Sequence, residues 1–256
     1  MNTFTLDFAD KHAIISLNRP KANAVNMEMI EELRETFAKL HDSETVEGVI
    51  LTGTGPIFCA GLDVVELFGY DVDTIARFWL EYGRLWRDMV AFPKPLICAV
   101  NGASPAGGCV FALCCDYRVM TRGKHSIGLN EIPVGVVVPP PLVEVARATV
   151  GNVNVGKMFY NGLLMKADEA LEIGLIDEVC EQDEILKKAE AQLLTWTNMP
   201  REPWQTMKKT IRGPIIEMLS TIDFDESFGP TLKAWWSDDN RKQVGKLVAK
   251  LTGSAG

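Results

Sequence analysis

The fold class follows from one stretch of the sequence, Leu96-Ile-Cys-Ala-Val-Asn-Gly-Ala-Ser-Pro-Ala-Gly-Gly-Cys-Val-Phe-Ala-Leu-Cys-Cys115. Its first five residues form an apolar run that predicts a strand buried on both faces, as in a parallel sheet. Asn101 and Gly102 end this strand, and residues 107–115 suit a buried helix. Residues 116–120 then predict a further strand. This order of strand, loop, helix and strand indicates a crossover unit of an α/β protein.

The same alternation continues on the N-terminal side of this stretch. Residues 13–17 and 48–52 predict strands. Between them Asn26 can cap a helix that runs to about Leu40, with apolar side chains at helical spacing on one face. Residues 75–89 carry aromatic and aliphatic side chains every three or four positions, which we interpret as the core-facing side of another helix.

The C-terminal part of the sequence has a different pattern. Strand signals disappear from about Glu184, and residues 185–199, 202–212 and 232–251 predict helices. We therefore expect an α/β domain over residues 1–195 and a helical region over residues 196–256. Trp235 and Trp236 lie in that helical region, either as interface anchors or as packing residues.

The composition is that of an ordinary globular protein. The chain has 256 residues, 47% of them hydrophobic and 23% charged, which excludes disordered and collagen-like classes. Its net charge is −8, and the Lys and Arg residues are scattered, so nucleic acid is not an expected partner.

Cysteine and histidine usage argues against disulfides and metal. Four of the six cysteines lie in the apolar stretch 96–115, where buried free thiols are expected. No C-x-x-C pair occurs, and the three histidines lie far apart in the sequence, so we expect no metal site.

The sequence predicts no membrane or export signal. The uncharged stretch 96–115 is long enough to span a bilayer, but Asn101, Ser104, Pro105 and three glycines interrupt it, so we expect a folded core and no membrane partner. The N-terminus lacks a basic, apolar signal sequence, and the last residues are not Ser-Lys-Leu. These features predict a cytoplasmic protein.

Two familiar motifs are incomplete. Residues 151–157 have the spacing of a phosphate-binding loop, but Met158 follows where Ser or Thr would hold magnesium. Ser104 follows a predicted strand, as a hydrolase nucleophile would, but Pro105 removes the next backbone donor that an oxyanion hole needs. A serine hydrolase therefore remains only a minor alternative.

Glu131 is the leading candidate for acid–base chemistry. Apart from His125, it is the one acidic or basic side chain between Lys124 and Glu144. If it is buried without a cationic partner its pKa should rise, as a general base working near neutral pH requires. The alternative is a loop glutamate that reaches solvent.

Two glycine-containing loops could supply the complementary hydrogen-bond donors. Residues 58–63 follow one predicted strand, and residues 105–109 begin the buried helix. Small residues let backbone approach a ligand closely, and the first N–H groups of a helix have no partner within it. A carboxylate and two donor loops together fit proton abstraction next to a carbonyl, with the enolate oxygen held by N–H groups.

Several motifs in this order resemble the crotonase (enoyl-CoA hydratase/isomerase) superfamily. They are Leu17-Asn-Arg-Pro-Lys-Ala-Asn-Ala24, Phe58-Cys-Ala-Gly-Leu-Asp63, Ala99-Val-Asn-Gly102 with Ala106-Gly-Gly-Cys109, Cys115-Asp116, and the stretch from Gly162 to Asp177. The resemblance covers about residues 5–200. It implies a ββα spiral core with a C-terminal helical trimerisation region, an assembly of three or six copies, and acyl-CoA thioester substrates.

The resemblance also assigns roles by position. It implies an oxyanion hole from the N–H groups of Leu62 and Gly107, with Glu131 as the catalytic carboxylate. The remaining substrate-binding and CoA-binding positions are Lys21, Ala22, Ala24, Ala60, Gly61, Asp63 and Asn130. Coenzyme A enters as part of the substrate, and no separate cofactor is expected.

One position favours isomerisation within this superfamily. The hydratases use two glutamates to deliver water, and the first of them aligns with Val110. The motifs are most similar to the mitochondrial-type Δ3,Δ2-enoyl-CoA isomerases, which implies a proton shuttle by one glutamate. A hydratase or another crotonase reaction, and a non-catalytic acyl-CoA-binding protein, remain alternatives. The residues placed at the acyl pocket are Phe68, Trp79, Val136 and 139–141.

Overall fold

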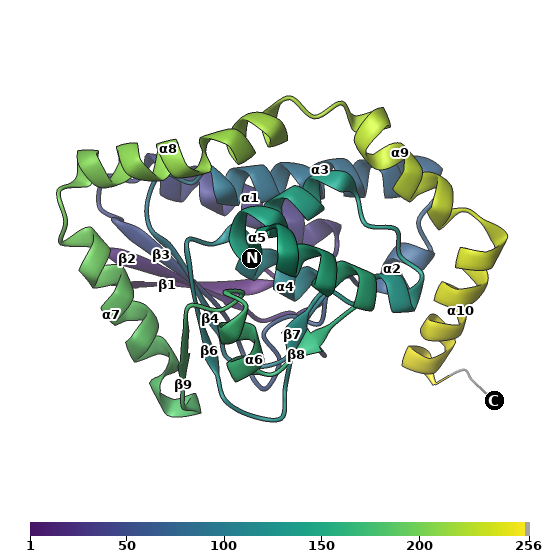
Figure 1. The fold of residues 1–256 in the computed structure, drawn as a ribbon, viewed down its shortest axis with the longest axis horizontal. Coiled ribbons are helices and arrows are strands. Elements are labelled where there is room, and N and C mark those ends of the chain that lie inside the picture. Colours follow the sequence, from purple (N-terminus) through teal and green to yellow (C-terminus); the bar gives the residue numbers. More distant parts are fainter. Residues whose placement is uncertain (254–256) are drawn as a thin grey trace.

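The computed structural model of the chain describes residues 1–253. The end of the predicted helical region, residues 254–256, lies outside the described residues. Within the described part, strands and helices alternate up to β9, and only helical elements follow (Figure 1). This confirms the predicted α/β class and the change to helix near Glu184.

The main sheet has the strand order β1-β2-β3-β4-β6-β9. β1 pairs with β2 in antiparallel fashion, and each further neighbour is parallel. The strands are β1 (Phe4–Ala9), β2 (His12–Leu17), β3 (Gly48–Gly53), β4 (Leu96–Val100), β6 (Tyr117–Thr121) and β9 (Glu178–Cys180).

Both faces of this sheet are covered, as the uncharged strand β4 predicts. On one face, alternate residues such as Ile50 and Ile97 pack against α7 (Ile185–Thr197). The residues between them, such as Leu51 and Cys98, belong to the larger core beneath α1 (Met27–Asp42), α3 (Val72–Val90) and α4 (Gly107–Cys114). Side chains alternate between the two faces of a strand, so a strand covered on both faces must be apolar throughout.

A second, small sheet carries the loops near the N-terminus of α4. β5 (Ser104–Pro105) pairs in parallel with β7 (Ile127–Gly128), which pairs antiparallel with β8 (Leu164–Met165). The Ala106 N–H donates to Gly128 O at 2.8 Å. This sheet therefore fixes the start of α4 relative to the segment that contains Glu131.

The helices begin where the sequence offers caps. The Asn26 side chain accepts from the Met29 N–H and starts α1, as predicted. Asp63 and Asp71 cap α2 (Val64–Phe68) and α3 in the same way. Further helical elements are η1 (Ile132–Val134), α5 (Pro140–Asn161), α6 (Ala167–Glu172) and η2 (Gln182–Glu184).

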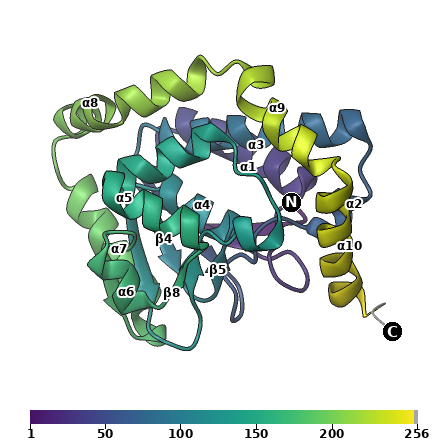
Figure 2. The same cartoon turned by 45° about the vertical axis from the view of Figure 1, so that its right-hand side comes forward.

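The C-terminal helices wrap around the edge of this core. α8 (Arg201–Ser220) crosses above α3, and α9 (Phe224–Trp235) leads to α10 (Asp238–Thr252), which lies beside α2 (Figures 1 and 2). Trp235 is buried and packs in the core, whereas Trp236 is partly exposed. The predicted helix 232–251 is therefore two helices, because the chain turns at Trp236 and Ser237 caps α10.

Other differences from the sequence prediction are local. The 139–141 segment leads into helix α5, with prolines in its first turn, where proline is tolerated. Gly151, considered above in a phosphate-binding loop, lies inside α5 at a kink with φ 74°. The predicted domain boundary at residues 195–196 lies within α7.

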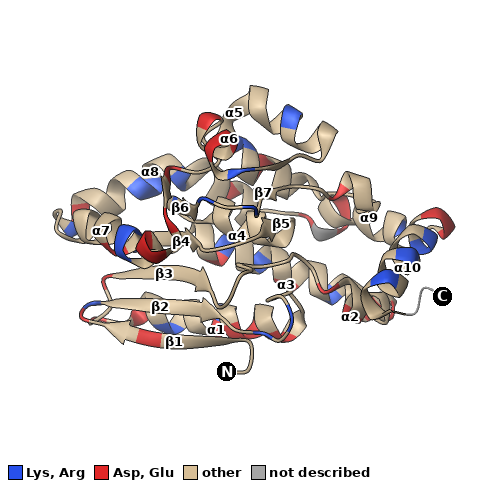
Figure 3. Cartoon of the chain, turned by 90° about the horizontal axis from the view of Figure 1, so that it is seen from below, with Lys and Arg blue, Asp and Glu red and all other residues tan. Residues whose placement is uncertain are grey.

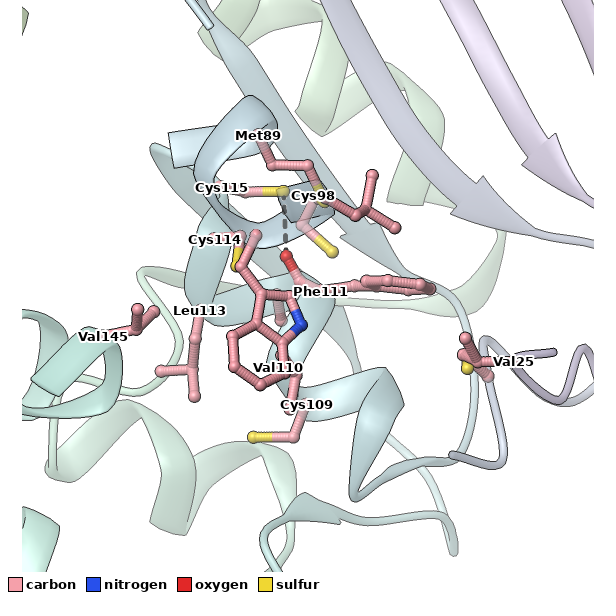
Figure 4. Packing of buried hydrophobic residues seen from close by; sticks show 14 of the residues in the cluster. Val25, Met89, Cys98, Cys109, Val110, Phe111, Leu113, Cys114, Cys115 and Val145 are labelled. Atoms are coloured by element: carbon pink, nitrogen blue, oxygen red, sulfur yellow. Dashed lines mark hydrogen bonds between the residues drawn. The ribbon is translucent and has the colours of Figure 1, made fainter. Parts of the chain in front are cut away.

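The six cysteines are free and buried, as predicted. Figure 4 shows Cys109, Cys114 and Cys115 around α4 and Cys98 on the neighbouring strand, among apolar side chains. The Cys115 thiol donates to Phe111 O at 3.2 Å. These thiols act as small core residues. Of the helices within residues 1–253, none has the length and hydropathy needed to cross a bilayer.

Candidate active site

A cavity of about 330 Å³ lies between α2, α3, the start of α4, the Glu131 segment and α10. Its lining includes Ala22, Ala24, Ala60, Leu62, Asp63, Gly107, Val110, Asn130 and Glu131. The structure therefore brings together most of the positions that the sequence placed in a site. Lys21 and Gly61 are not in the lining: Lys21 is exposed, and Gly61 is buried.

Two loops form one wall of the cavity. The Ala60 N–H donates to Ala22 O at 3.0 Å, and the Val25 N–H donates to Gly61 O at 2.8 Å. Gly61 has φ +95°, and a Cβ there would lie 3.0 Å from the Ala106 Cβ. A side chain at Gly61 would thus push this wall away from the start of α4, which explains the glycine.

The two predicted backbone donors, Leu62 and Gly107, lie where the loop around Gly61 approaches the start of α4. Gly107 is the first residue of α4, and Ala106 before it has φ 47°. Within residues 1–253, neither the Leu62 N–H nor the Gly107 N–H donates a hydrogen bond to protein. Both residues line the cavity. The positive end of the α4 dipole adds to this site's preference for negative charge.

Glu131 lies in the same cavity and is 9% exposed. Its backbone carbonyl accepts from the Val134 and Val136 N–H groups at 3.1 and 2.9 Å, which fixes the turn. Its Oε2 atom is buried and has no hydrogen-bond partner among the described residues. Burial raises the pKa of Glu131 to about 7. The alternative of a solvent-exposed loop glutamate is therefore wrong.

The other carboxylate in the lining, Asp63, is already engaged. Its Oδ2 accepts from Arg19 at 2.7 Å, and its Oδ1 accepts from the Glu66 N–H at 3.0 Å, capping α2. Arg19 also pairs with Glu66 at 2.9 Å. Asp63 therefore holds the loop that carries Leu62, and Glu131 is the unpaired carboxylate of this lining.

The rest of the cavity is apolar. Val110 is buried one turn into α4 from Gly107, and Figure 4 shows it on that helix. Trp79, Val136 and Pro139 line the cavity as predicted, but Pro140 and Pro141 do not.

Phe68 was placed in the acyl pocket by the sequence and this is wrong. Its ring instead stacks under the Arg241 guanidinium of α10, 3.6 Å from the ring centroid, and α10 is held against α2 by this contact. Leu247 and Leu251 of α10 close the cavity. Figure 3 shows basic residues along α10, so only part of this helix is apolar.

Sequence reasoning missed several of the lining residues. Leu247 and Leu251 come from the far end of the chain, and no local pattern connects them to the site. Tyr82 and Trp86 lie in the aromatic stripe of α3 that we interpreted as core, yet they line the cavity. The aromatic stripe of α3 is buried as predicted, but two of its residues, Tyr82 and Trp86, also line the cavity.

The serine hydrolase alternative finds no support in this geometry. Ser104 is fully buried in β5 and does not line the cavity, so it is not placed as a nucleophile. No group of three or more His, Cys, Asp and Glu side chains in residues 1–253 is arranged to hold a metal ion.

Residues 8–222 match the family model described as enoyl-CoA hydratase/isomerase, and the chain belongs to this family. It is 37% identical over 202 residues to the mouse protein named enoyl-CoA delta isomerase 1, mitochondrial, covering 78% of this chain and 70% of that protein. The human protein of the same name is 32% identical over 211 residues, 82% of this chain and 70% of that protein.

Two further relatives extend the comparison. The crystal structure of human mitochondrial delta3-delta2-enoyl-CoA isomerase matches all of this chain, and is itself fully covered, with a TM-score of 0.94 and 28% identity. The short-chain-enoyl-CoA hydratase of Clostridium acetobutylicum is 31% identical over 98% of this chain and 96% of that protein. The predicted crotonase-type fold is thereby confirmed.

Proposed function

We propose that this chain is a 3,2-trans-enoyl-CoA isomerase, which moves a 3-enoyl-CoA double bond to the conjugated 2-position. The observation that supports the proposal is the buried Glu131 carboxyl, whose Oε2 has no partner among the described residues, in an apolar cavity lined also by Leu62 and Gly107, whose N–H groups donate to no protein group within residues 1–253. This set of groups can remove and return a proton next to a thioester.

In the proposed mechanism, the thioester oxygen accepts hydrogen bonds from the Leu62 and Gly107 N–H groups. Glu131 takes the proton from C2, and the C–H electron pair moves into a dienolate whose negative charge rests on the thioester oxygen. The same carboxyl then returns the proton to C4, and the double bond moves to C2–C3. A pKa of about 7 suits a group that must accept and release a proton near neutral pH.

The structure of the cavity favours this reaction over hydration. Hydration needs a second polar group to hold water, but the position one turn into α4 carries the buried aliphatic side chain of Val110. The relatives named isomerase at 32% and 37% identity support the same choice. The hydratase of C. acetobutylicum, at 31% identity, makes hydration the second candidate.

The substrate path and the assembly are proposed from the family resemblance, and the location from the sequence signals. The CoA part of the substrate would run along the loops that carry Lys21, Ala22, Ala24 and Ala60. The proposed assembly is a homotrimer or a hexamer built from trimers. No separate cofactor is required by the reaction, and a cytoplasmic location remains a prediction, since the mouse and human relatives are named mitochondrial.

The test is the ultraviolet absorbance of trans-3-hexenoyl-CoA mixed with purified protein, with Glu131→Gln alongside. We expect the conjugated thioester to appear with the wild type and the rate to fall by several orders of magnitude in Glu131→Gln. Chromatography of the products detects hydration as 3-hydroxyacyl-CoA. Retained activity in the variant would exclude Glu131 as the base, and thermal stabilisation by CoA thioesters without turnover would indicate a binding protein.

A further inference from the structure

Tyr82 presents a polar group that the proposed mechanism does not yet use. It lies on α3 and lines the same cavity as Leu62, Gly107 and Glu131. Its side chain is only 2% exposed. The sequence places it among the core residues of α3, and in the structure it is both buried there and part of the cavity lining.

The Tyr82 hydroxyl has no hydrogen-bond partner among the described residues. A buried hydroxyl without a partner costs about 1–3 kcal/mol. The rings around it belong to Trp86, Phe78, Phe111 and Trp79, with centroid distances of 4.8, 5.8, 6.2 and 6.3 Å. These rings hold the phenol in place but offer its proton no oxygen or nitrogen acceptor.

Trp86 limits what the hydroxyl can do. The indole Nε1 atom of Trp86 is buried and has no hydrogen-bond partner of good geometry among the described residues. It is close enough to the Tyr82 oxygen to act against the rise in the Tyr82 pKa. An indole N–H can only donate. It can therefore face the Tyr82 oxygen but cannot accept its proton, so that proton is available to a group in the cavity.

The hydroxyl lies beside one of the two proposed backbone donors. A Cβ built on Gly107 would be 3.0 Å from Tyr82 Oη, and its other nearest atoms belong to Gly61. The phenol oxygen is thus at the start of α4, beside Gly107, whose N–H donates to no protein group within residues 1–253.

We propose that the Tyr82 hydroxyl donates a third hydrogen bond to the thioester oxygen, together with the N–H groups of Leu62 and Gly107. This inference rests on the proposed function, because it assumes a thioester oxygen at the two N–H groups. The bond strengthens as negative charge develops on that oxygen, so it lowers the barrier to proton removal more than it tightens substrate binding.

The protonation state of Tyr82 agrees with this role. Burial raises its pKa well above the ordinary value of 10, and the nearby Glu131 carboxylate acts in the same direction. Tyr82 is therefore a neutral donor throughout the working pH range, and it does not compete with Glu131 as a base.

The first experiment compares Tyr82→Phe with the wild type on trans-3-hexenoyl-CoA. This variant keeps the ring and removes only the hydroxyl. Loss of one oxyanion donor lowers kcat by about 10²–10³ in well-studied cases, so we expect a fall of about 10-fold or more when two other donors remain, with KM within about 3-fold. Tyr117→Phe is the control, because its hydroxyl contacts Glu178 at 3.3 Å, outside the cavity.

The second experiment measures charge stabilisation without turnover. Acetoacetyl-CoA forms an enolate with its own ultraviolet absorbance, and the pH at which half of the bound ligand is enolised reports on the donors. We expect this midpoint to rise by about one pH unit in Tyr82→Phe, which corresponds to a 10-fold weaker preference for the enolate. If the wild type binds this ligand but does not isomerise hexenoyl-CoA, the proposed function fails while the enolate shift still tests Tyr82.

The outcomes separate a donor from a packing residue. An unchanged kcat together with an unchanged enolisation midpoint would overturn the proposal. The proposal would also be overturned if Tyr82→Phe kept the wild-type kcat but its KM rose as the acyl chain of the substrate became longer. That result would assign Tyr82 to the acyl pocket. If Tyr82→Phe folds poorly, 3-fluorotyrosine at position 82 keeps the shape and makes the phenol a stronger donor, and the midpoint should then move to lower pH.

Discussion

At the scale of single residues, Glu131 determines the pH dependence of the reaction. Its pKa is raised to about 7 by burial, and only the ionised carboxylate can take the C2 proton. We expect kcat/KM to be constant above about pH 7 and to fall tenfold per pH unit below it, since kcat/KM reports the free enzyme. Initial rates on hexenoyl-CoA from about pH 5.5 to 8.5 measure this. A kcat/KM that stays constant down to about pH 5.5 would contradict the raised pKa, because the inflection would then lie near the ordinary glutamate value of 4.5.

The same burial makes Glu131 costly for stability. A carboxyl whose pKa is higher in the folded state than in the unfolded state destabilises the fold as pH rises from about 4.5 to 7, and by a constant amount above that range. At 1.36 kcal/mol per pKa unit the cost is about 3 kcal/mol. We therefore expect Glu131→Gln to have a higher free energy of unfolding than the wild type at pH 8, and a similar one near pH 4.5.

Urea unfolding of the two proteins at both pH values tests this prediction. Glu144→Gln is a suitable control, because this side chain is partly exposed and pairs with Arg147 on the surface of α5. The prediction fails if Glu131→Gln is no more stable than the wild type at pH 8, or if the difference does not depend on pH.

At the scale of elements, α8 is joined to the sheet by a buried charge pair. Lys208 Nζ donates to Asp116 Oδ2 at 2.6 Å and to Lys94 O at 3.0 Å, and the same Asp116 oxygen accepts from the Leu96 N–H at 2.9 Å. Both side chains are about nine-tenths buried. The pair connects the helix to the ends of β4 and β6, so the C-terminal helices and the parallel strands depend on each other.

Removing one partner of this pair should destabilise the protein more than removing both charges. Lys208→Met leaves a buried carboxylate that keeps the Leu96 N–H at 2.9 Å and the more distant Arg212 cation at 3.8 Å, and we expect a loss of about 3–5 kcal/mol. The double variant Asp116→Asn with Lys208→Met should recover part of it. Urea titrations of the wild type, both single variants and the double variant measure the coupling. Additive effects of the two substitutions would rule out an energetically coupled pair.

At the scale of the whole molecule, the sequence predicts best where local pattern and burial agree. The strand Leu96–Val100 is uncharged because both of its faces are covered, so its class could be predicted from composition alone. The strands β5, β7 and β8 have two residues each and exist only because distant segments meet. No local period of side chains can predict them.

The site residues also divide into those that local sequence features predict and those that depend on how distant segments pack. Glu131 and the two donor loops, residues 58–63 and 105–109, could be predicted because an isolated carboxylate and glycine-containing loops after a strand or before a helix are local features. The crotonase resemblance supplied Leu62 and Gly107 as the donors within those loops. The contributions of Tyr82, Leu247 and Leu251 depend on how α3, α4 and α10 pack. An aromatic stripe at helical spacing predicts a buried helix face but does not tell which of its polar ends will face a cavity.

The surface of α5 provides the last prediction, on assembly. Val153 and Tyr160 are 71% and 84% exposed, and with Ile132 and Val137 they line an apolar groove. Exposed apolar groups that gather in this way usually mark an interface. If the proposed homotrimer forms through this face, sedimentation equilibrium should give about three times the chain mass of 28.3 kDa, or six times for a dimer of trimers.

Charged substitutions on this face should then dissociate the assembly. We expect Val153→Glu with Tyr160→Glu to sediment as a monomer at micromolar concentration, because two carboxylates would lose their hydration in an apolar interface. Phe8→Glu is the matched control: Phe8 is 63% exposed on the edge strand β1, away from the groove, and should leave the assembly unchanged. A wild-type chain that sediments as a monomer would overturn the proposed trimer. A double variant that keeps the wild-type mass would place the interface on another face.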